Sequence, residues 1–523
     1  MASKITYVTL SADEKIDSEY EAALARFRHD LDEYYPMYIE GEEVRSDEGE
    51  FVHRSPIDTS IVVGHFQKGT GTHARLAIEA AKRALVTWGN LSWQERVRIM
   101  RRAADLIDQR KFDIAAAITY EVGKTRLEAL AETSEAIDAI RYYANVVEEN
   151  SGYTRALGPG AAGERSEMVM RPHGVWVVIS PFNFPFMLAN GMLLGALITG
   201  NTVILKPTSE APLTGLMLYR IYCDAGVSKG AINYVTGPGA EFEEEFASSP
   251  DVAGIAFTGS RDVGMKLYRE FLDRQPYPKP VVLEMGSKNP TIVTSNGDLQ
   301  KAVEGIARAA FGYGGQKCSA TSRVYVQNNV KSQFLDLLIA RVKELAVGDP
   351  RYKSTFLGPL INEDAAKRFV KAVDDAKQAG GTIVCGGHVL KNGDLAKGYY
   401  AEPTVITNIP NDNRLFREEL FVPLIVIDDF RTLDEALSKA NDTEYGLTAG
   451  IFTEDSQEIQ KLMNGIQFGV VYAYRRGGAT TGAWPGAQTF VGWKGSGATG
   501  RGIGGPHYLL NFIREQSQTV VSE

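Results

Sequence analysis

The spacing of apolar residues changes partway along the chain. From residue 73 to about 152, apolar positions recur three and four residues apart, which predicts amphipathic helices. Beyond this stretch, short β-rich apolar runs alternate with helical segments. These runs are GVWVVIS (174–180), NTVILKP (201–207), AINYVTG (231–237), VAGIAFTGS (252–260) and PVVLEMG (280–286). The alternation predicts a parallel sheet covered by helices on both faces.

A second alternating series begins near residue 286. Its strand-like runs are NPTIVTS, SRVYVQ, GGTIVCGG, FVPLIVIDDF and GLTAGIFT, and helix-like segments such as KSQFLDLLIARVKEL lie among them. This series predicts a second α/β domain. The C-terminal IREQSQTVVSE is polar and strand-like, so we expect it to pair with a segment elsewhere.

Composition narrows the range of partners. The chain has 523 residues and is 44% hydrophobic, enough for two or three domains at roughly 100 to 200 residues each. A net charge of −9 with both signs mixed argues against a nucleic-acid partner, because phosphate backbones are bound by clustered Lys and Arg. We therefore expect a small-molecule partner.

Cysteine content and the first residues bear on location. Only three cysteines occur, which suits a reducing compartment. The first twenty residues carry many acids and no apolar core, so we expect no signal or transit peptide and a cytoplasmic protein.

Two features invite other interpretations that the sequence does not favour. The apolar run 186–205 is about as long as a membrane span, but glycines and asparagines interrupt it, so we expect a buried helix and strand and no membrane partner. The one G-x-G-x-x-G match, 495–500, follows no clear strand and opens no convincing helix, and therefore lacks the context of a dinucleotide loop.

Candidate chemistry lies where the predicted strands end, because ligands bind at the carboxyl ends of strands in open α/β sheets. Asn183 stands in the proline-rich PFNFPF, where its amide could serve an oxyanion or only its own turn. Lys206 follows NTVIL and could hold a ribose or phosphate, or be a solvated surface lysine.

The next two strand ends carry a serine and a carboxyl. Ser260, after Gly259, opens a helix and could bind a pyrophosphate or act as a helix cap. Glu284 ends a buried strand, where burial would raise its pKa and make it a base, unless it pairs with Lys288.

Cys318 is the cysteine placed on a bend, between a helix and a strand. We expect the bend to expose the sulfur and to direct backbone N–H groups at it, which would favour the thiolate, although a buried inert cysteine fits the same pattern. The surroundings of Cys223 and Cys385 look like helix and strand packing.

Eight motifs together resemble the aldehyde dehydrogenase superfamily from about residue 50 to the C-terminus. In chain order they are PFNFP, KPTSEAP, FTGS, LEMGSKNP, GQKCSATSR, LGPLI, EELFVP and NDTEYGLTAGIFT. The resemblance implies an α/β fold with a Rossmann-type NAD(P)-binding domain (1–285), a catalytic thiol domain (286–490) and a C-terminal segment (491–523). The last segment and about 152–172 would form a small β oligomerisation element, which implies a homodimer or a larger homo-oligomer.

The resemblance also implies a role for each candidate. Cys318 would attack the aldehyde carbon, the Asn183 amide and the Cys318 N–H would hold the oxyanion, and Glu284 would activate the water that releases the acid. Lys206 would hold the adenosine ribose, with Gly259 and Ser260 at the pyrophosphate. The cofactor-binding set would be Ser180, Pro181, Phe182, Lys206, Ser209, Gly259, Ser260, Glu419 and Phe421. No metal is expected.

Three segments are similar to a subgroup, the 1-pyrroline-5-carboxylate dehydrogenases: GYGGQKCSATSR, TGAWPGAQTFVG (481–492) and SGATGRGIGGPHYLLNF (496–512). The similarity implies oxidation of L-glutamate γ-semialdehyde to L-glutamate in proline degradation. The substrate would be held by Ser319, Gly482, Ala483, Phe490 and Phe186. A dehydrogenase for another aliphatic or aromatic aldehyde is the alternative, and a non-catalytic relative is a third reading.

The chain departs from the family pattern at several positions. Ser287 and Val422 replace glycines near the cofactor, and the loop GAWPGAQTFVG lacks the usual Pro before its Phe. Ser209 stands where an acid often binds the ribose, which leaves NADP use open, although we favour NAD.

Overall fold

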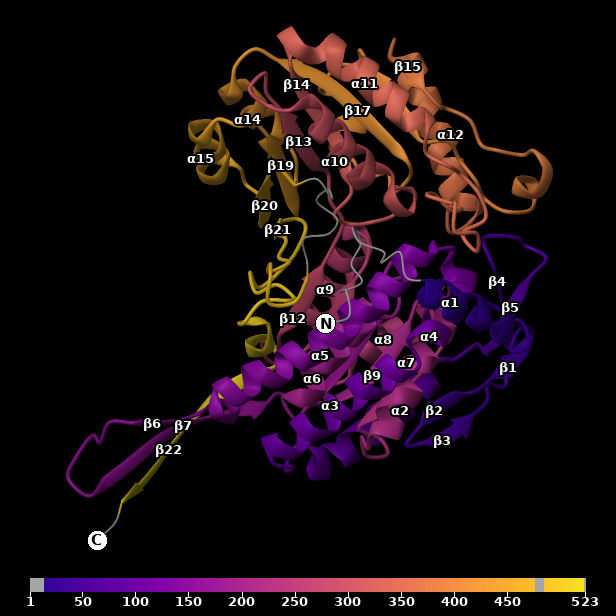
Figure 1. Ribbon diagram of the computed structural model, residues 1–523. Coiled ribbons are helices and arrows are strands. Elements are labelled where there is room, and N and C mark those ends of the chain that lie inside the picture. The colour runs from indigo at the N-terminus through magenta and orange to yellow at the C-terminus, as the bar shows by residue number, and fades with distance from the viewer. Residues whose placement is uncertain (1–13, 476–483, 522–523) are drawn as a thin grey trace.

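Two seven-stranded sheets organise the computed structural model, which describes residues 14–475 and 484–521 (Figure 1). The first sheet has the order β12-β11-β8-β9-β10-β2-β3. Its parallel strands are β8 (Val175–Ser180), β9 (Thr202–Pro207), β10 (Ile232–Tyr234), β11 (Val252–Thr258) and β12 (Val281–Glu284). β2 (Met37–Ile39) and β3 (Glu42–Val44) extend it antiparallel. The predicted parallel strands are confirmed.

Helices cover both faces of this sheet, because successive side chains of a strand point to opposite sides. Trp176 and Val178 of β8 belong to one buried cluster with α3, α5, α6 and α7, whereas Val175 and Val177 belong to another with α2, α8 and α9. The helices are α2 (Gly71–Trp88), α3 (Trp93–Gln109), α4 (Lys111–Val122), α5 (Arg126–Glu149), α6 (Met187–Ile198), α7 (Pro212–Ala225), α8 (Ala240–Ser248) and α9 (Arg261–Arg274). The helical stretch predicted from 73 to 152 is thus α2 to α5.

The second sheet has the order β15-β16-β17-β14-β13-β19-β20 and is parallel except for β15. Its strands are β13 (Asn289–Val293), β14 (Thr321–Gln327), β15 (Thr382–Cys385), β16 (Thr404–Thr407), β17 (Leu424–Phe430), β19 (Thr448–Phe452) and β20 (Val470–Ala473). The helices of this part are α10 (Leu299–Phe311), α11 (Lys331–Lys343), α12 (Glu363–Gln378), α13 (Arg414–Arg417), α14 (Leu433–Asn441) and α15 (Ser456–Gly465). The chain passes between the sheets at 285–288, and the predicted domain boundaries stay a prediction.

A three-stranded arm extends away from both sheets (Figure 1). β6 (Thr154–Leu157) and β22 (Ile513–Val521) pair antiparallel with β7 (Glu164–Pro172), so the C-terminal segment forms the strand that its sequence predicted. Leu157, Val520 and Val521 are exposed on this arm.

The N-terminal part adds α1 (Glu14–Phe27) and a small sheet of β1 (Glu33–Tyr35), β5 (Val62–Gln67) and β4 (Glu50–Arg54). Near the C-terminus, the two-residue β21 (Trp493–Lys494) leads into 495–500, and no helix starts there. The apolar run 186–205 is the buried α6 followed by most of β9. Within the part of the chain that the structure describes, no helix combines the length and apolarity needed to cross a membrane.

Candidate active site

A cleft of about 640 Å³ lies at the carboxyl ends of β8, β9, β11 and β12 and continues to the second sheet. It brings together side chains that are far apart in the sequence. Among the predicted residues, its wall holds Ser180, Pro181, Phe182, Asn183, Lys206, Ser209, Gly259, Ser260, Cys318, Glu419 and Phe421. Every residue predicted for the cofactor therefore lines one cleft, together with the thiol and the amide.

Cys318 lies on a turn between the 3₁₀ helix η2 (Gly312–Gly315) and β14. The backbone N–H groups of Cys318 and Ser319 face its sulfur, as predicted. The expected exposure is wrong, because the side chain is 9% exposed. Burial, with the negative charges of Glu284 and Glu419 nearby, raises the pKa of the thiol well above its usual range, so the resting form is the neutral thiol rather than the thiolate.

The turn that carries Cys318 is fixed from the neighbouring strand. The hydroxyl of Ser287 and the amide of Asn289 both donate to the Cys318 carbonyl, the second at 2.8 Å. Gly315 adopts a positive φ of 66°, and a Cβ there would lie 2.5 Å from the Val422 carbonyl oxygen, so the turn needs a glycine at this position. Ser287, one of the family departures, thus holds the backbone of the nucleophile candidate.

Glu284 ends β12 and faces this thiol. Its Oε1 lies 3.9 Å from Cys318 Sγ. Desolvation raises the pKa of Glu284 to about 8. Among the described residues no cation pairs with it, and the Nζ of Lys288 is buried without a hydrogen-bond partner, so the predicted alternative of a Glu284–Lys288 pair is wrong.

Asn183 offers a free amide at the same place. Its side chain is buried on the cleft wall and makes no hydrogen bond to any described residue, so it does not serve its own turn. The loop around it is anchored by Glu132, which accepts the N–H groups of Phe186 and Met187 at 2.9 and 3.0 Å and pairs with the buried Lys124. A fixed loop with an unengaged amide is suited to stabilise developing negative charge.

The adenosine end of the predicted cofactor site presents buried polar groups. Lys206 is buried, with one hydrogen bond to the Pro207 carbonyl at 3.2 Å, and desolvation lowers its pKa to about 8. The Ser180 hydroxyl is buried without a partner. Ser260 begins α9 without capping it, which disfavours the helix-cap alternative and leaves its hydroxyl to face the cleft. Unsatisfied polar groups at a helix N-terminus fit a bound diphosphate.

The other end of the cleft is built around Glu419. Its carboxylate accepts the Ser287 N–H at 2.8 Å, and burial raises its pKa to about 7. A Cβ on Gly286 would lie 2.1 Å from Glu419 Oε2, so this approach requires glycine. Phe421 holds a φ of 58°, a costly conformation for an aromatic residue, and packs edge-on against Phe182.

The residues predicted to bind the substrate do not all line one cavity. Ser319 is buried beside Cys318, and Phe490 lines a small cavity next to Glu284. Phe186 is fully buried at the start of α6. The neighbouring Phe184 packs with Leu188 and Trp484. Gly482 and Ala483 lie outside the described residues.

Two charged residues at the site were not predicted to take part in it. Arg368 of α12 lines the cleft without a hydrogen bond or ion pair to a described residue. Lys317, next to Cys318, forms a buried ion pair with Glu128 of α5 at 2.7 Å. Both come from segments whose position at the cleft depends on how the two sheets pack.

Comparisons with known proteins identify the family of this chain. Residues 44–518 match the model of the aldehyde dehydrogenase family. The chain is 36% identical over 503 residues to a 1-pyrroline-5-carboxylate dehydrogenase of Geobacillus kaustophilus, covering 95% of each protein. The chain therefore belongs to the aldehyde dehydrogenase family.

Solved structures show the same fold. A 1-pyrroline-5-carboxylate dehydrogenase from Thermus with bound NAD superposes with a TM-score of 0.93, 33% identity and 98% of each chain covered. A betaine aldehyde dehydrogenase from Staphylococcus aureus in complex with NAD⁺ superposes with a TM-score of 0.89, 29% identity and 96% and 97% coverage. The predicted α/β fold of the aldehyde dehydrogenases is thus confirmed.

Proposed function

We propose that the protein oxidises L-glutamate γ-semialdehyde to L-glutamate, with NAD as hydride acceptor. The observation that carries the reaction type is the thiol of Cys318, which lies 3.9 Å from the carboxyl of Glu284 in a cleft whose wall also holds the free amide of Asn183. The full-length similarity to 1-pyrroline-5-carboxylate dehydrogenases supports the substrate.

Each residue has one task in the proposed reaction. The Cys318 sulfur bonds to the aldehyde carbon as its thiol proton passes to solvent in the cleft, and the Asn183 amide and the Cys318 N–H stabilise the oxyanion. NAD held by the cleft residues would supply the hydride acceptor for that carbon, and Cys318 would then carry a thioester. Glu284 takes a proton from water as the water attacks the thioester, so that acid and thiol are released.

The residues present fit NAD. Lys206, Ser180 and Ser260 supply buried or unengaged polar groups for the adenosine ribose and diphosphate, and Arg368 of α12 adds a cation at the wall of the same cleft. Glu419 supplies a carboxylate for the hydroxyls of the second ribose.

A panel of aldehydes tests the substrate. NADH formation is followed with glutamate γ-semialdehyde, propanal and benzaldehyde, and kcat/KM should be highest for the semialdehyde. Equal or better use of propanal or benzaldehyde would favour the alternative of another aldehyde substrate, and no turnover at all would favour a non-catalytic relative.

Ser209→Glu should increase the preference of the enzyme for NAD over NADP. Ser209 is half-buried near Lys206, and the adjacent Glu210 is already engaged by Asn362 at 2.8 Å, so no free carboxylate faces the ribose there. A glutamate would repel a 2′-phosphate, and we expect NADP use to fall tenfold or more relative to NAD, about 1.4 kcal/mol. The measurement is kcat/KM for both cofactors, with Ser209→Gln as the uncharged control; equal losses in both variants would contradict it.

We also propose that the arm joins subunits into a homo-oligomer. Its exposed apolar side chains at Leu157, Val520 and Val521 are suited to a protein interface. A chain ending at Asn511 should lose β22 and show a smaller mass by light scattering than the full chain. An unchanged mass would exclude the arm as the contact.

A further inference from the structure

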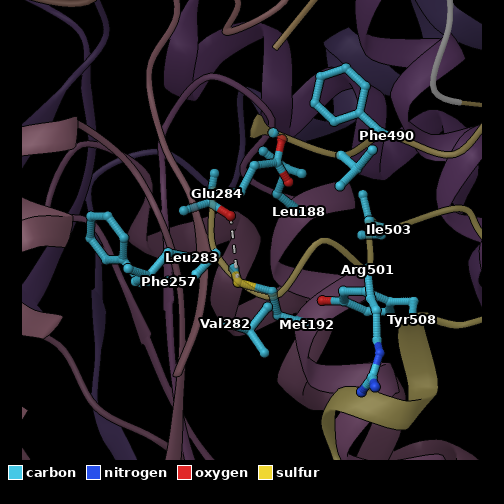
Figure 2. A pocket seen from close by; sticks show the side chains of 15 residues that line it. Leu188, Met192, Phe257, Val282, Leu283, Glu284, Phe490, Arg501, Ile503 and Tyr508 are labelled. Atoms are coloured by element: carbon cyan, nitrogen blue, oxygen red, sulfur yellow. Dashed lines mark hydrogen bonds between the residues drawn. The ribbon is translucent and has the colours of Figure 1, made fainter. Parts of the chain in front are cut away.

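A second, much smaller cavity adjoins Glu284 (Figure 2). Its volume is about 20 Å³, and it is separate from the cofactor cleft. The wall is mostly apolar, with Leu188 and Met192 of α6 on one side and Phe490 and Ile503 of the C-terminal segment on the other. Glu284 therefore borders an apolar chamber as well as the thiol.

Tyr508 gives this chamber a second polar group. It lies in the 3₁₀ helix η6 (Tyr508–Asn511), is 3% exposed and lines the cavity. Its hydroxyl makes no hydrogen bond to a residue that the structure describes, whereas the neighbouring Tyr143 hydroxyl accepts the Gly504 N–H at 2.7 Å. A buried hydroxyl is costly unless something satisfies it.

The other polar side chains at the wall are already engaged. The Thr258 hydroxyl lies 3.6 Å from the Met192 sulfur as a weak donor, and the guanidinium of Arg501 donates to the Leu510 carbonyl at 3.3 Å. Figure 2 shows the Arg501 side chain pointing away from Glu284. Tyr508 and Glu284 are therefore the two polar side chains of the wall that remain available to a molecule in the chamber.

We propose that one water molecule in this chamber links the Tyr508 hydroxyl to the Glu284 carboxylate, which makes Tyr508 a positioning residue for the base. A single water needs about 10 to 15 Å³ and at least two polar partners, and the chamber offers both. The phenol donates to the water and the water donates to the carboxylate, so no proton is consumed. The inference rests on the proposed function, in which Glu284 activates the attacking water.

The proposed water link should affect the pKa of Glu284, because among the residues that the structure describes no cation near the carboxyl stabilises its ionised form. The titratable groups that face the carboxyl are the thiol of Cys318, Glu135 of α5 and Tyr508, and none is a cation. Burial raises the pKa of Glu284, and hydrogen bonding to the charged form opposes that rise. Without the phenol, the carboxylate should ionise only at higher pH.

Tyr508→Phe tests this with p-nitrophenyl acetate, an activated ester. The burst of nitrophenolate reports acylation of Cys318, and the steady state reports release of acetate by water. We expect an unchanged burst. The rise of the steady-state rate with pH should shift to higher pH by about one unit, so that below the midpoint of this rise acetate is released about tenfold more slowly. Tyr143→Phe is the matched control, because Tyr143 stacks on Tyr508 at 5.7 Å but does not line the chamber.

Each result decides the matter. The proposal is overturned if Tyr508→Phe keeps the wild-type limb, if it loses the burst, or if Tyr143→Phe shifts the limb equally. Glu284→Gln distinguishes failure of this proposal from failure of the proposed function. If Glu284→Gln releases acetate normally, Glu284 is not the base. If Glu284→Gln does not release acetate while Tyr508→Phe behaves like the wild type, only the role of Tyr508 is excluded.

Discussion

Replacing Cys318 by alanine should abolish NADH formation while leaving the fold and NAD binding intact. The thiol supplies the bond to the aldehyde carbon, and no other described side chain at the cleft wall offers a comparable nucleophile. The loss should reach background, because removal of a nucleophile commonly costs several orders of magnitude in rate. NADH absorbance with saturating aldehyde measures the loss, and tryptophan fluorescence quenching by NAD measures binding.

The chain supplies its own controls for this variant. Cys223 is exposed on α7 and Cys385 is half-buried on β15, and neither lines the cleft. Cys223→Ala and Cys385→Ala should keep wild-type turnover. Normal turnover in Cys318→Ala would refute the proposed mechanism as a whole.

The raised pKa of Cys318 adds a pH dependence to this prediction. The thiol is neutral in the resting enzyme, so its alkylation by iodoacetamide should be slow near neutrality and accelerate as pH rises. Fast, pH-independent alkylation of the wild type, absent in Cys318→Ala, would show a thiolate in the resting enzyme instead.

The fold could be predicted because its signals are local. Buried parallel strands such as β8 and β9 are short apolar runs between helices, and each ends at a chemically distinct residue. The same rule located Asn183, Lys206, Ser260 and Glu284, because the carboxyl ends of parallel strands meet at one edge.

The rest of the site depends on contacts between distant segments. The sequence predicted an exposed Cys318 from its bend, but packing of the second sheet against the first buries the sulfur and places Glu284 and Glu419 beside it. Arg368 sits on an ordinary amphipathic helix, and only that packing turns it toward the cofactor cleft. Ser287 looked like a lost glycine, yet its hydroxyl supports the Cys318 backbone.

Glu284→Gln should uncouple the two halves of the reaction. The thiol and the oxyanion donors are untouched, so one NADH per active site should form rapidly with saturating aldehyde and NAD. Release of the acid then lacks its base, and steady-state turnover should fall by about 10² to 10⁴. Rapid mixing with detection of NADH resolves the burst from the steady state, and the covalent acyl group should be visible by mass spectrometry of the quenched enzyme.

The pKa of Glu284 determines in which direction acid release should change with pH. Glu284 must be ionised to accept a proton, and burial raises its pKa to about 8, so hydrolysis by the wild type should rise with pH through that value. Glu284→Gln should lose this rise, and hydroxylamine, which attacks a thioester without a base, should restore turnover. Glu135→Gln is the control, because it changes another buried carboxyl coupled to Glu284 and should keep acid release. A burst-free Glu284→Gln with wild-type turnover would assign the water-activating step to another group, and the raised pKa of Glu284 would then be only a consequence of its burial.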